Sequence, residues 1–381
     1  MQRFSAVDEA YMQLAIELAR KGLYSTKPNP AVGCVLVKDE RIVGQGWHRK
    51  AGLPHAERVA LAEAGESARE ATAYVTLEPC SHHGRTPPCA DGLIEAGVKR
   101  VVVAMRDPNP LVAGSGIERM QQAGIVVEVG LLSDQARELN PGFIQMMEKQ
   151  RPFVRLKMAS SLDGRTAMAN GESQWITGSE ARLEVHKLRA RSGAMVTGIG
   201  TVLADDPSMN VRLPEELLAE LNLDEDSCQP LRVVLDPNLS MPLDAKMRSV
   251  PGRIILMTSK ETVERDPALV ETLIGAGFEL VAVASEEDRL DIGSVLDYLA
   301  QEEEIREVMV ESGAIVAGAF MRSGMVDELH CFIAPVLMGH QAKPMFVLPE
   351  LETMQDKLTY QLESMDRLGE DVHLVLTPKS N

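Results

Sequence analysis

One histidine and two cysteines near the beginning of the chain are of the types that bind zinc. They are His55, Cys80 and Cys89, and Pro79 directly precedes the first cysteine. One imidazole and two thiolates form a three-ligand set that leaves the fourth tetrahedral position of zinc open to water. Glu57 follows the histidine by two positions, where its carboxylate can move protons between that water and a bound substrate. The sequence therefore predicts a catalytic zinc site in which Glu57 is the proton shuttle.

The order His-x-Glu, Pro-Cys and a second cysteine is the signature of zinc-dependent nucleobase deaminases. In that signature two residues usually separate the cysteines, whereas Cys80 and Cys89 are nine positions apart. Zinc lowers the pKa of bound water to about 7, so that hydroxide can attack the amine-bearing carbon of an amidine-like ring. A closed structural site with His82 or His83 as fourth ligand is the alternative, but it would leave Glu57 without a function.

Two further stretches could contact a substrate. The polar insert between the cysteines carries His82, His83 and Arg85, which either grip the substrate or belong to an ordinary solvated loop. Asn29 precedes Pro30 where a loop leads into a strand, and a turn asparagine and a substrate contact fit that position equally well.

Composition limits the class of substrate. The chain has 381 residues, enough for two domains with their own cores, and a formal net charge of -17. No block of Lys and Arg stands out, and because a phosphate backbone needs a positive surface, a polynucleotide substrate is disfavoured. A small anionic substrate needs only two or three well-placed cations.

The cysteines and the lengths of the apolar runs indicate the cellular compartment of the protein. A sparse, odd set of five cysteines is no disulfide framework and is typical of a reducing compartment. The N-terminus has no apolar core of signal-peptide type, and no run of about 18 apolar residues could span a bilayer. We therefore expect a cytoplasmic protein without a membrane partner.

Strands and helices alternate along the first part of the chain, which predicts a three-layer α/β domain. The expected helices span 8–21, 55–65, 89–96 and 117–123, and the expected strands span 31–37, 41–47, 74–77, 101–105 and 125–129. His55 and Glu57 then open one helix and Cys89 opens another. Free N–H groups at helix starts favour thiolates, so the placement agrees with metal binding.

A second domain begins where Arg151-Pro152 introduces a new apolar strand, so the expected domains are 1–148 and 149–381. Its strands are expected at 153–159, 194–198, 231–235, 253–257, 278–283, 307–311 and 328–333, and its helices at 179–191, 262–276, 291–303 and 314–323. Gly198-Ile199-Gly200 fails as a dinucleotide fingerprint because Leu203 occupies the place of the third glycine. The turn at Ser312-Gly313, between a strand and a helix, is a better cofactor-phosphate site, with a plain turn as the alternative.

Seven stretches together resemble the bifunctional bacterial riboflavin-biosynthesis deaminase/reductases over nearly the whole chain. They are P-N-P-A-V-G at 28–33, H-A-E at 55–57, T-L-E-P-C-S-H-H-G-R-T-P-P-C at 76–89, D-P-N-P at 107–110, S-L-D-G-R-T-A at 161–167, G-E-S-Q-W-I-T at 171–177 and G-I-G-T-V-L-A-D-D-P at 198–207. The wide cysteine spacing is a property of this family. The resemblance implies an α/β chain with a cytidine-deaminase-like domain followed by a dihydrofolate-reductase-like domain.

The resemblance also implies two consecutive reactions. The first removes ammonia from 2,5-diamino-6-ribosylamino-4(3H)-pyrimidinone 5′-phosphate at one zinc ion held by His55, Cys80 and Cys89. The second uses NADPH to reduce the ribosyl group of 5-amino-6-(5-phosphoribosylamino)uracil to a ribityl chain. Family members associate, so a homo-oligomer is expected.

Residue roles in the second reaction follow from the same resemblance. The implied NADP contacts are Ala159, Trp175, Thr177, Thr201, Asp205 and the segment Gly313–Ala319. The implied substrate contacts are Ser173, Arg189, Met209, Arg212 and Glu311. Arg189 and Arg212 suit a phosphate clamp because guanidinium groups bind phosphate oxygens in pairs, although a surface salt bridge is the commoner use of an arginine. Locally, Trp175 is more typical of a core residue than of a stacking platform.

Lys157 and Glu311 are the candidate catalytic residues of the reductase, assisting ring opening of the ribosylamine before hydride arrives at C1′. Two alternatives stay open. The second domain could bind a nucleotide without reducing anything, or the chain could be a polynucleotide deaminase.

Overall fold

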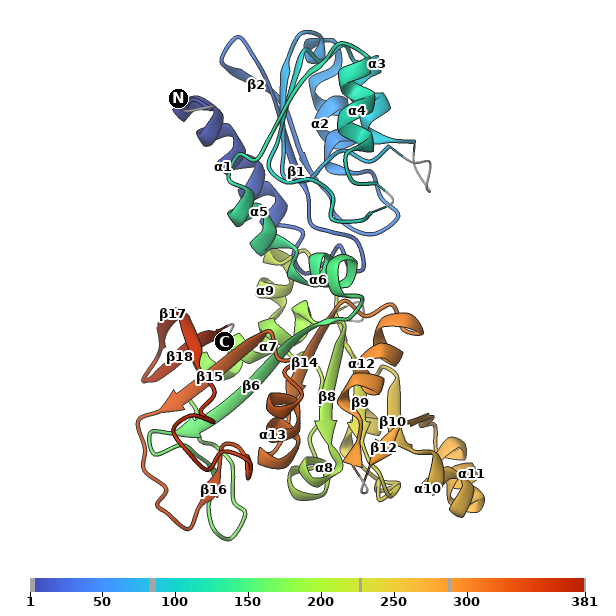
Figure 1. The fold of residues 1–381 in the computed structure, drawn as a ribbon, viewed down its shortest axis with the longest axis vertical. Coiled ribbons are helices and arrows are strands. Elements are labelled where there is room, and N and C mark those ends of the chain that lie inside the picture. Colours follow the sequence, from blue (N-terminus) through green and yellow to red (C-terminus); the bar gives the residue numbers. More distant parts are fainter. Residues whose placement is uncertain (1–3, 82–86, 111, 226–227, 287–288, 380–381) are drawn as a thin grey trace. The chain divides into compact units, whose positions relative to one another are not determined.

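The computed structural model describes residues 4–81, 87–110, 112–225, 228–286 and 289–379. The chain divides into two compact units, which are treated separately below (Figure 1). Unit 1 comprises Met1–Gln150 with Glu215–Asp224, and unit 2 comprises Arg151–Pro214 with Glu225–Asn381. The short helix α9 (Glu215–Glu220), which has no buried residue, is grouped with unit 1.

Unit 1 is a five-stranded sheet covered by helices on both faces. The strand order is β2-β1-β3-β4-β5, with β1 antiparallel to both its neighbours and β3, β4 and β5 parallel. The strands are β1 (Gly33–Lys38), β2 (Arg41–Trp47), β3 (Thr72–Val75), β4 (Arg100–Val103) and β5 (Val126–Val129). The helices are α1 (Ala6–Arg20), α2 (Ala56–Ala64), α3 (Cys89–Glu95), α4 (Ser115–Gln122), α5 (Ser133–Leu139) and α6 (Pro141–Lys149), with a 3-10 turn at Gly65–Ala68. The prediction of a three-layer α/β domain is confirmed.

Alternation along the strands explains the two layers of helices. In β1, Val35 and Val37 face the core shared with α1, α5 and α6, whereas Cys34 and Leu36 face the core shared with α2, α3 and α4. Helix α1 begins at a capping box, in which Ser5 accepts the backbone N–H of Asp8 and the Asp8 carboxylate accepts that of Ser5. The predicted strand at 74–77 starts and ends earlier, at Thr72–Val75, and directly after it the Thr76 hydroxyl accepts the Gly33 N–H.

Unit 2 contains a nine-stranded sheet in the order β11-β10-β9-β8-β14-β6-β15-β18-β17. All strands from β11 to β15 in this order are parallel, and β18 is antiparallel to both β15 and β17. The strands are β6 (Phe153–Ser161), β8 (Ala194–Gly198), β9 (Leu231–Leu235), β10 (Ile254–Ser259), β11 (Glu279–Val283), β14 (Glu307–Glu311), β15 (Glu328–Ala334), β17 (Tyr360–Leu368) and β18 (Asp371–Pro378). Short pairs join β7 (Arg165–Ala167) to β16 (Lys343–Pro344) and β12 (Ser285–Glu286) to β13 (Arg289–Leu290).

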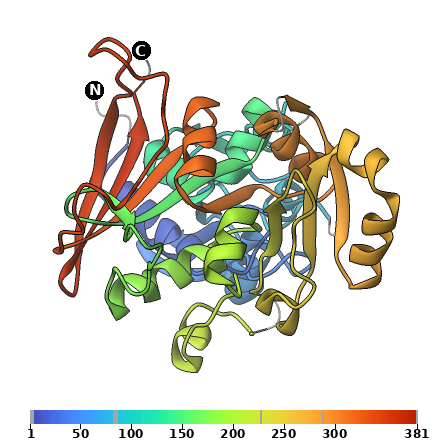
Figure 2. The same cartoon turned by 90° about the horizontal axis from the view of Figure 1, so that it is seen from below.

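Helices cover both faces of the parallel part of this sheet. Helices α12 (Ile292–Gln301) and α13 (Ala314–Arg322) share the largest core with it, whereas α7 (Ser179–Arg191), α8 (Ile199–Asp205) and α11 (Pro267–Gly275) pack on the other face. The hairpin of β17 and β18, red in Figure 2, extends one edge of the sheet. Among the described residues no helix is long and apolar enough to cross a membrane.

Two features of unit 2 differ from expectation. The helix predicted at 262–276 is two helices, α10 (Lys260–Arg265) and α11, because Pro267 cannot continue a helix and Asp266 caps the second one through the Leu269 N–H. The C-terminal hairpin was not predicted. Its outer strand is largely exposed and polar, so it lacks the apolar alternation of a half-buried strand.

Candidate active sites

The three predicted zinc ligands of unit 1 come together in space. His55 is the N-cap of α2, Cys89 is the first residue of α3, and Cys80 lies in the loop between β3 and α3. The His55 Nδ1 atom is 3.7 Å from Cys80 Sγ and 3.4 Å from Cys89 Sγ. Tetrahedral zinc with Zn–S of about 2.3 Å and Zn–N of about 2.0 Å places sulfur and nitrogen about 3.5 Å apart. The donor set and its spacing therefore fit zinc.

The two thiols differ because they share one proton. Hydrogen bonds from the Cys89 thiol and from His55 lower the pKa of Cys80 to about 4, and the Cys89 backbone N–H contributes a further bond of 3.3 Å. The bond to Cys80 and burial raise the pKa of Cys89. A divalent cation among the three side chains would replace that proton and satisfy both sulfurs as thiolates.

Glu57 lies in the first turn of α2, beside the ligands. It is 3 % exposed, and its carboxyl group interacts with the Cys89 thiol. Burial, with the negative charge of Cys80 as a second cause, raises the pKa of Glu57 to about 7. Within the described residues the cluster able to hold a metal consists of His55, Cys80 and Cys89. Glu57 is therefore placed against the ligand set without belonging to it.

Asn29 reaches the zinc site through His48, a residue that the sequence analysis did not single out. The Asn29 amide Nδ2 is 3.1 Å from His48 Nε2, and His48 Nδ1 is 3.2 Å from the Pro54 carbonyl oxygen. Burial lowers the pKa of His48, so the ring is neutral, donates from Nδ1 and accepts from Asn29. Its ring stands edge-on to that of His55 at 5.2 Å. The predictions for His82, His83 and Arg85 lie outside the described residues.

Glu78 holds the chain around Cys80 in place. Its buried carboxylate accepts four backbone N–H groups, from Asp107 at 3.2 Å, Gly114 at 3.0 Å, Gly116 at 3.0 Å and Ile117 at 3.3 Å. These N–H groups give both carboxylate oxygens hydrogen-bond partners in place of water. Glu78 thus ties the turn before Cys80 to the loop and first turn that lead into α4.

The close packing of Gly116 against the turn before Cys80 makes a prediction for Gly116→Ala. Helix propensity alone favours alanine by up to about 1 kcal/mol. A Cβ at Gly116 would lie 2.1 Å from the Pro79 carbonyl oxygen, so the backbone must shift and we expect a net destabilisation of about 1–3 kcal/mol. Thermal unfolding measures it, with Gln121→Ala on the exposed side of α4 as the control. Equal or higher stability of the Gly116 variant would show that the close packing does not matter.

In unit 2, the predicted catalytic residues of the reductase form one charged cluster. Glu311 ends β14 and is paired in register with Lys157 of β6, whose Nζ is 3.7 Å from Glu311 Oε2. Arg189 of α7 binds both carboxylate oxygens of Glu311, at 2.6 and 2.9 Å, and donates to the Asn210 carbonyl at 3.0 Å. Burial opposes ionisation, but the charges of Arg189 and Lys157 lower the pKa of Glu311 to about 2. Burial lowers the pKa of Lys157, which Glu311 partly offsets.

Two of the predicted cofactor contacts, Thr201 and Gly313, lie just beyond the carboxyl ends of β8 and β14. The Thr201 hydroxyl of α8 accepts the Gly313 N–H, at the start of α13, at 3.1 Å. Ser173 donates to Asp205 at 2.8 Å, which joins a predicted substrate contact to a predicted cofactor contact. Carboxyl ends of parallel strands are the usual ligand site of α/β sheets. Ala159 lies near the end of β6, half-buried against the core of α7.

The local interpretation of Trp175 as a core residue is wrong. Its side chain is 70 % exposed, with the Arg182 guanidinium 4.8 Å from the ring centre, and the Thr177 carbonyl accepts a bond from the same arginine. An exposed, oriented ring is available to stack on a flat ligand. Met209, in contrast, is 3 % exposed and packs in a core with Val202, so little of it is open to a substrate.

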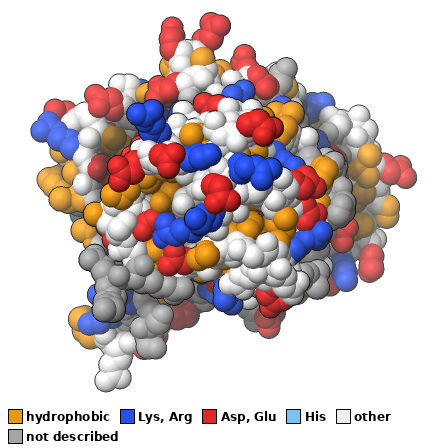
Figure 3. All heavy atoms as spheres, turned by 90° about the horizontal axis from the view of Figure 1, so that it is seen from above, with side chains coloured by type: hydrophobic (Ala, Val, Ile, Leu, Met, Phe, Trp, Pro, Cys, Tyr) orange, Lys and Arg blue, Asp and Glu red, His pale blue; other side chains and the backbone are white. Residues whose placement is uncertain are grey.

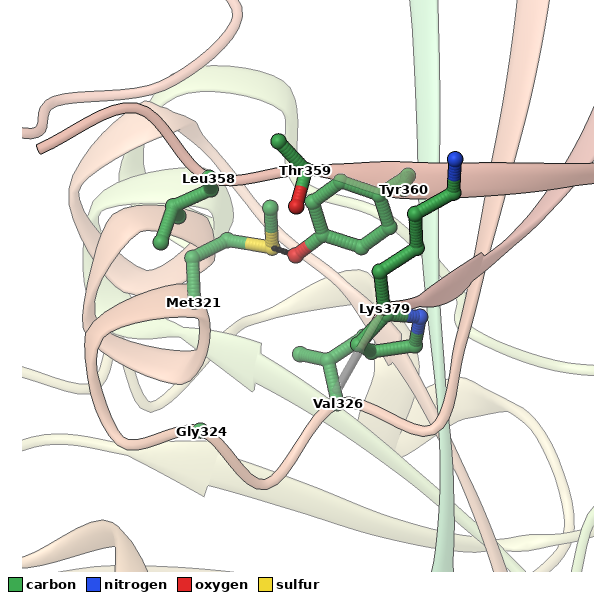
Figure 4. A pocket seen from close by; sticks show the side chains of 8 residues that line it. Met321, Gly324, Val326, Leu358, Thr359, Tyr360 and Lys379 are labelled. Atoms are coloured by element: carbon green, nitrogen blue, oxygen red, sulfur yellow. Dashed lines mark hydrogen bonds between the residues drawn. The ribbon is translucent and has the colours of Figure 1, made fainter. Parts of the chain in front are cut away.

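The pocket drawn in Figure 4 lies elsewhere in unit 2, where α13 meets the ends of β17 and β18. The Tyr360 hydroxyl is directed to the Met321 sulfur at 3.4 Å, and Lys379 is the one charged side chain among the described residues of the lining. None of the predicted site residues lines it.

A deaminase-type zinc site on a three-layer domain, followed by a parallel-sheet domain with a charged cluster at its strand ends, defines a fusion of two enzymes. Family models agree: the cytidine and deoxycytidylate deaminase zinc-binding region matches residues 5–105, and the RibD C-terminal domain matches residues 152–374. Riboflavin biosynthesis protein RibD of Haemophilus influenzae is 47% identical over 100% of both chains. That of Escherichia coli is 46% identical over 97% of this chain and 99% of the relative.

Solved structures give the same result. Acinetobacter baumannii RibD has a TM-score of 0.88 at 47% identity, covering 98% of this chain and 99% of the other. A deaminase/reductase from Thermotoga maritima has a TM-score of 0.83 at 36% identity, with the same coverage. The chain belongs to the riboflavin biosynthesis protein RibD family. It is a bifunctional deaminase and reductase that uses zinc and NADPH, which confirms the predicted family, fold class, function and cofactors.

Proposed function

We propose that a deaminase domain at 1–148 acts on 2,5-diamino-6-ribosylamino-4(3H)-pyrimidinone 5′-phosphate. A reductase domain at 149–381 then acts on 5-amino-6-(5-phosphoribosylamino)uracil. The observation that carries the first assignment is the cluster of His55, Cys80 and Cys89 with a buried carboxyl group against it. When bound, zinc supplies an activated water and a positive charge for the developing oxyanion.

Within the deaminase domain, Glu57 moves the protons. It accepts one proton from the attacking water and delivers it to the ring nitrogen. It then takes the second proton from the hydroxyl group now on the ring carbon and passes it to the departing amine, so that the carbonyl forms and ammonia leaves. Water adds one oxygen to the ring carbon and the amine departs, so no redox equivalent is needed. We assign substrate binding to Asn29, which contacts His48, and the His48 ring in turn lies against that of His55.

Within the reductase domain, ring opening of the ribosylamine needs a proton on the ribose ring oxygen. Lys157 and Glu311 lie together beside Arg189, and we assign the proton transfer to Lys157 and its orientation to Glu311. NADPH supplies the hydride to C1′. Arg189 and Arg212 bind the 5′-phosphate, while Thr201, Asp205 and the segment Gly313–Ala319 hold the cofactor.

Lys157→Ala should lower reductase turnover by about 100-fold, the size of a lost general acid. Ammonia release by the deaminase domain should stay unchanged in the same preparation, and thermal unfolding checks that the reductase domain of the variant is folded. NADPH oxidation with the deaminated substrate is the measurement. Unchanged reductase turnover would remove Lys157 from the mechanism.

Incubation of the pure protein with the diaminopyrimidinone ribonucleotide, with and without NADPH, tests both assignments at once. We expect ammonia release without NADPH, and NADPH oxidation only after deamination. Ammonia release without any NADPH oxidation would favour a second domain that binds nucleotide but does not reduce.

A polynucleotide substrate has less support. On the face drawn in Figure 3, Lys and Arg side chains lie among Asp and Glu side chains rather than in one extended basic patch. Binding assays with single-stranded DNA and tRNA should therefore be negative.

We further propose that the protein works in the cytoplasm as a homo-oligomer, and light scattering after gel filtration measures its assembly.

A further inference from the structure

The cluster around Glu311 contains a histidine to which neither sequence pattern nor family resemblance gave a role. His186 lies on α7, three positions before Arg189 and therefore on the same side of the helix. Lys157, Arg189, Arg212 and Glu311 all act on its pKa. Three cations against one carboxylate leave an excess of positive charge, which suits a phosphate monoester.

Arg212 has most of the donors that this site can offer to a ligand. Arginine carries five N–H groups. In the described part of the chain, the Arg189 guanidinium directs three of its donors to Glu311 and Asn210, whereas that of Arg212 makes one bond, to the Asn210 side chain. Arg212 is also exposed. Phosphate affinity therefore depends on where the backbone holds Arg212.

His186 and Arg189 both hold that backbone to α7, and His186 is the one that binds Arg212 itself. Its Nδ1 accepts the backbone N–H of Arg212 at 3.1 Å, while Arg189 holds the Asn210 carbonyl in the same segment. Gln229 pairs with both backbone groups of Val211, at 2.9 and 3.1 Å. An Nδ1 that accepts requires a neutral ring with its proton on Nε2. Burial and the charges of Arg189 and Arg212 lower the pKa of His186 to about 4, which keeps the ring neutral at pH 7.

We propose that His186 is a positioning residue of the reductase: by accepting the Arg212 N–H, it sets the Arg212 guanidinium for the 5′-phosphate of the substrate. This rests on the proposed function, in which Arg189 and Arg212 form the phosphate clamp. In this role His186 acts through its Nδ1 atom as a hydrogen-bond acceptor. It carries no charge and transfers no proton.

Two near-isosteric variants separate these roles. In His186→Asn the side-chain oxygen can take the place of Nδ1, whereas in His186→Gln the amide extends toward the place of Nε2. Binding of 5-amino-6-(5-phosphoribosylamino)uracil and of its dephosphorylated form is measured by calorimetry without NADPH, and thermal unfolding checks that the reductase domain of each variant is folded. We expect the preference for the phosphorylated form to fall about tenfold in the Gln variant, as for one lost hydrogen bond, and to stay within about twofold in the Asn variant.

The kinetics should show a raised KM for the phosphorylated substrate with kcat nearly unchanged. If the Asn variant loses as much preference as the Gln variant, or if both forms of the ligand weaken equally, the assignment of Nδ1 is overturned.

Arg212→Met tests the underlying clamp separately. Normal phosphate preference in Arg212→Met would overturn the proposed function of Arg212, whereas its loss there with no change in His186→Gln would overturn the role of His186 alone.

Discussion

Glu57→Gln should lower ammonia release by about 10²–10⁴-fold while zinc remains bound. Glutamine has nearly the shape of glutamate and can fill the same buried position in the first turn of α2. It cannot accept a proton from water or return one to a leaving amine. The variant therefore removes proton transfer without opening a cavity next to the zinc ligands.

The measurement pairs two readings on one sample. Metal content by mass spectrometry should stay near one zinc per chain, since Glu57 is not among the clustered ligands. Reductase turnover on the deaminated substrate should equal that of the unchanged protein. Deamination at the normal rate in a zinc-loaded variant would contradict the proton-shuttle role. Loss of zinc would instead make Glu57 part of the ligand environment.

Much of unit 1 could be predicted because its signals are local. The zinc ligands are set by short motifs, and the helices that carry His55 and Cys89 begin at those residues, as their pattern predicts. A buried strand such as β4 is recognisable from its own valines. Each of these statements needs only a few neighbouring residues.

The supporting contacts could not be predicted, because they join distant parts of the chain. Glu78 holds residues 107–117, and His186 holds Arg212, through bonds to backbone N–H groups that carry no residue-type signal. His48, which follows β2, reaches Asn29, which precedes β1. A histidine at the end of a predicted strand close to a predicted zinc site was the one available hint.

The reductase site illustrates the same limit. The family resemblance names Lys157, Arg189 and Glu311 as site residues. Only the fold shows that their charges lie side by side. Glu311 is neutralised from β6 and from α7, two separate elements that both lie far before it in the sequence. Only the parallel register of β6 and β14 places Lys157 opposite Glu311.

Glu311→Gln should therefore affect both stability and reduction. The carboxylate balances Arg189 and Lys157, and its removal leaves two partly buried cations without their counter-charge, which costs about 3–5 kcal/mol when a buried pair is broken. The lowered pKa of Glu311 also indicates that its ionised form stabilises the fold. Ionised Glu311 stabilises the fold above its ordinary pKa of 4.5, and that contribution is lost as the pH falls toward about 2.

Denaturant unfolding at pH 7 measures the loss, and Glu279→Gln is the matched control. Glu279 also pairs with an arginine, Arg253, but both side chains are about half exposed, so the cost should be at most about 1 kcal/mol. In the Glu311 variant the stability difference should shrink on acidification toward pH 3, while that of the control stays small throughout.

Because Lys157 also loses its partner, NADPH oxidation should fall at least as far as in Lys157→Ala, with ammonia release retained. A variant as stable as the control, and fully active as a reductase, would show that Glu311 neither balances the cluster nor orients the proton donor.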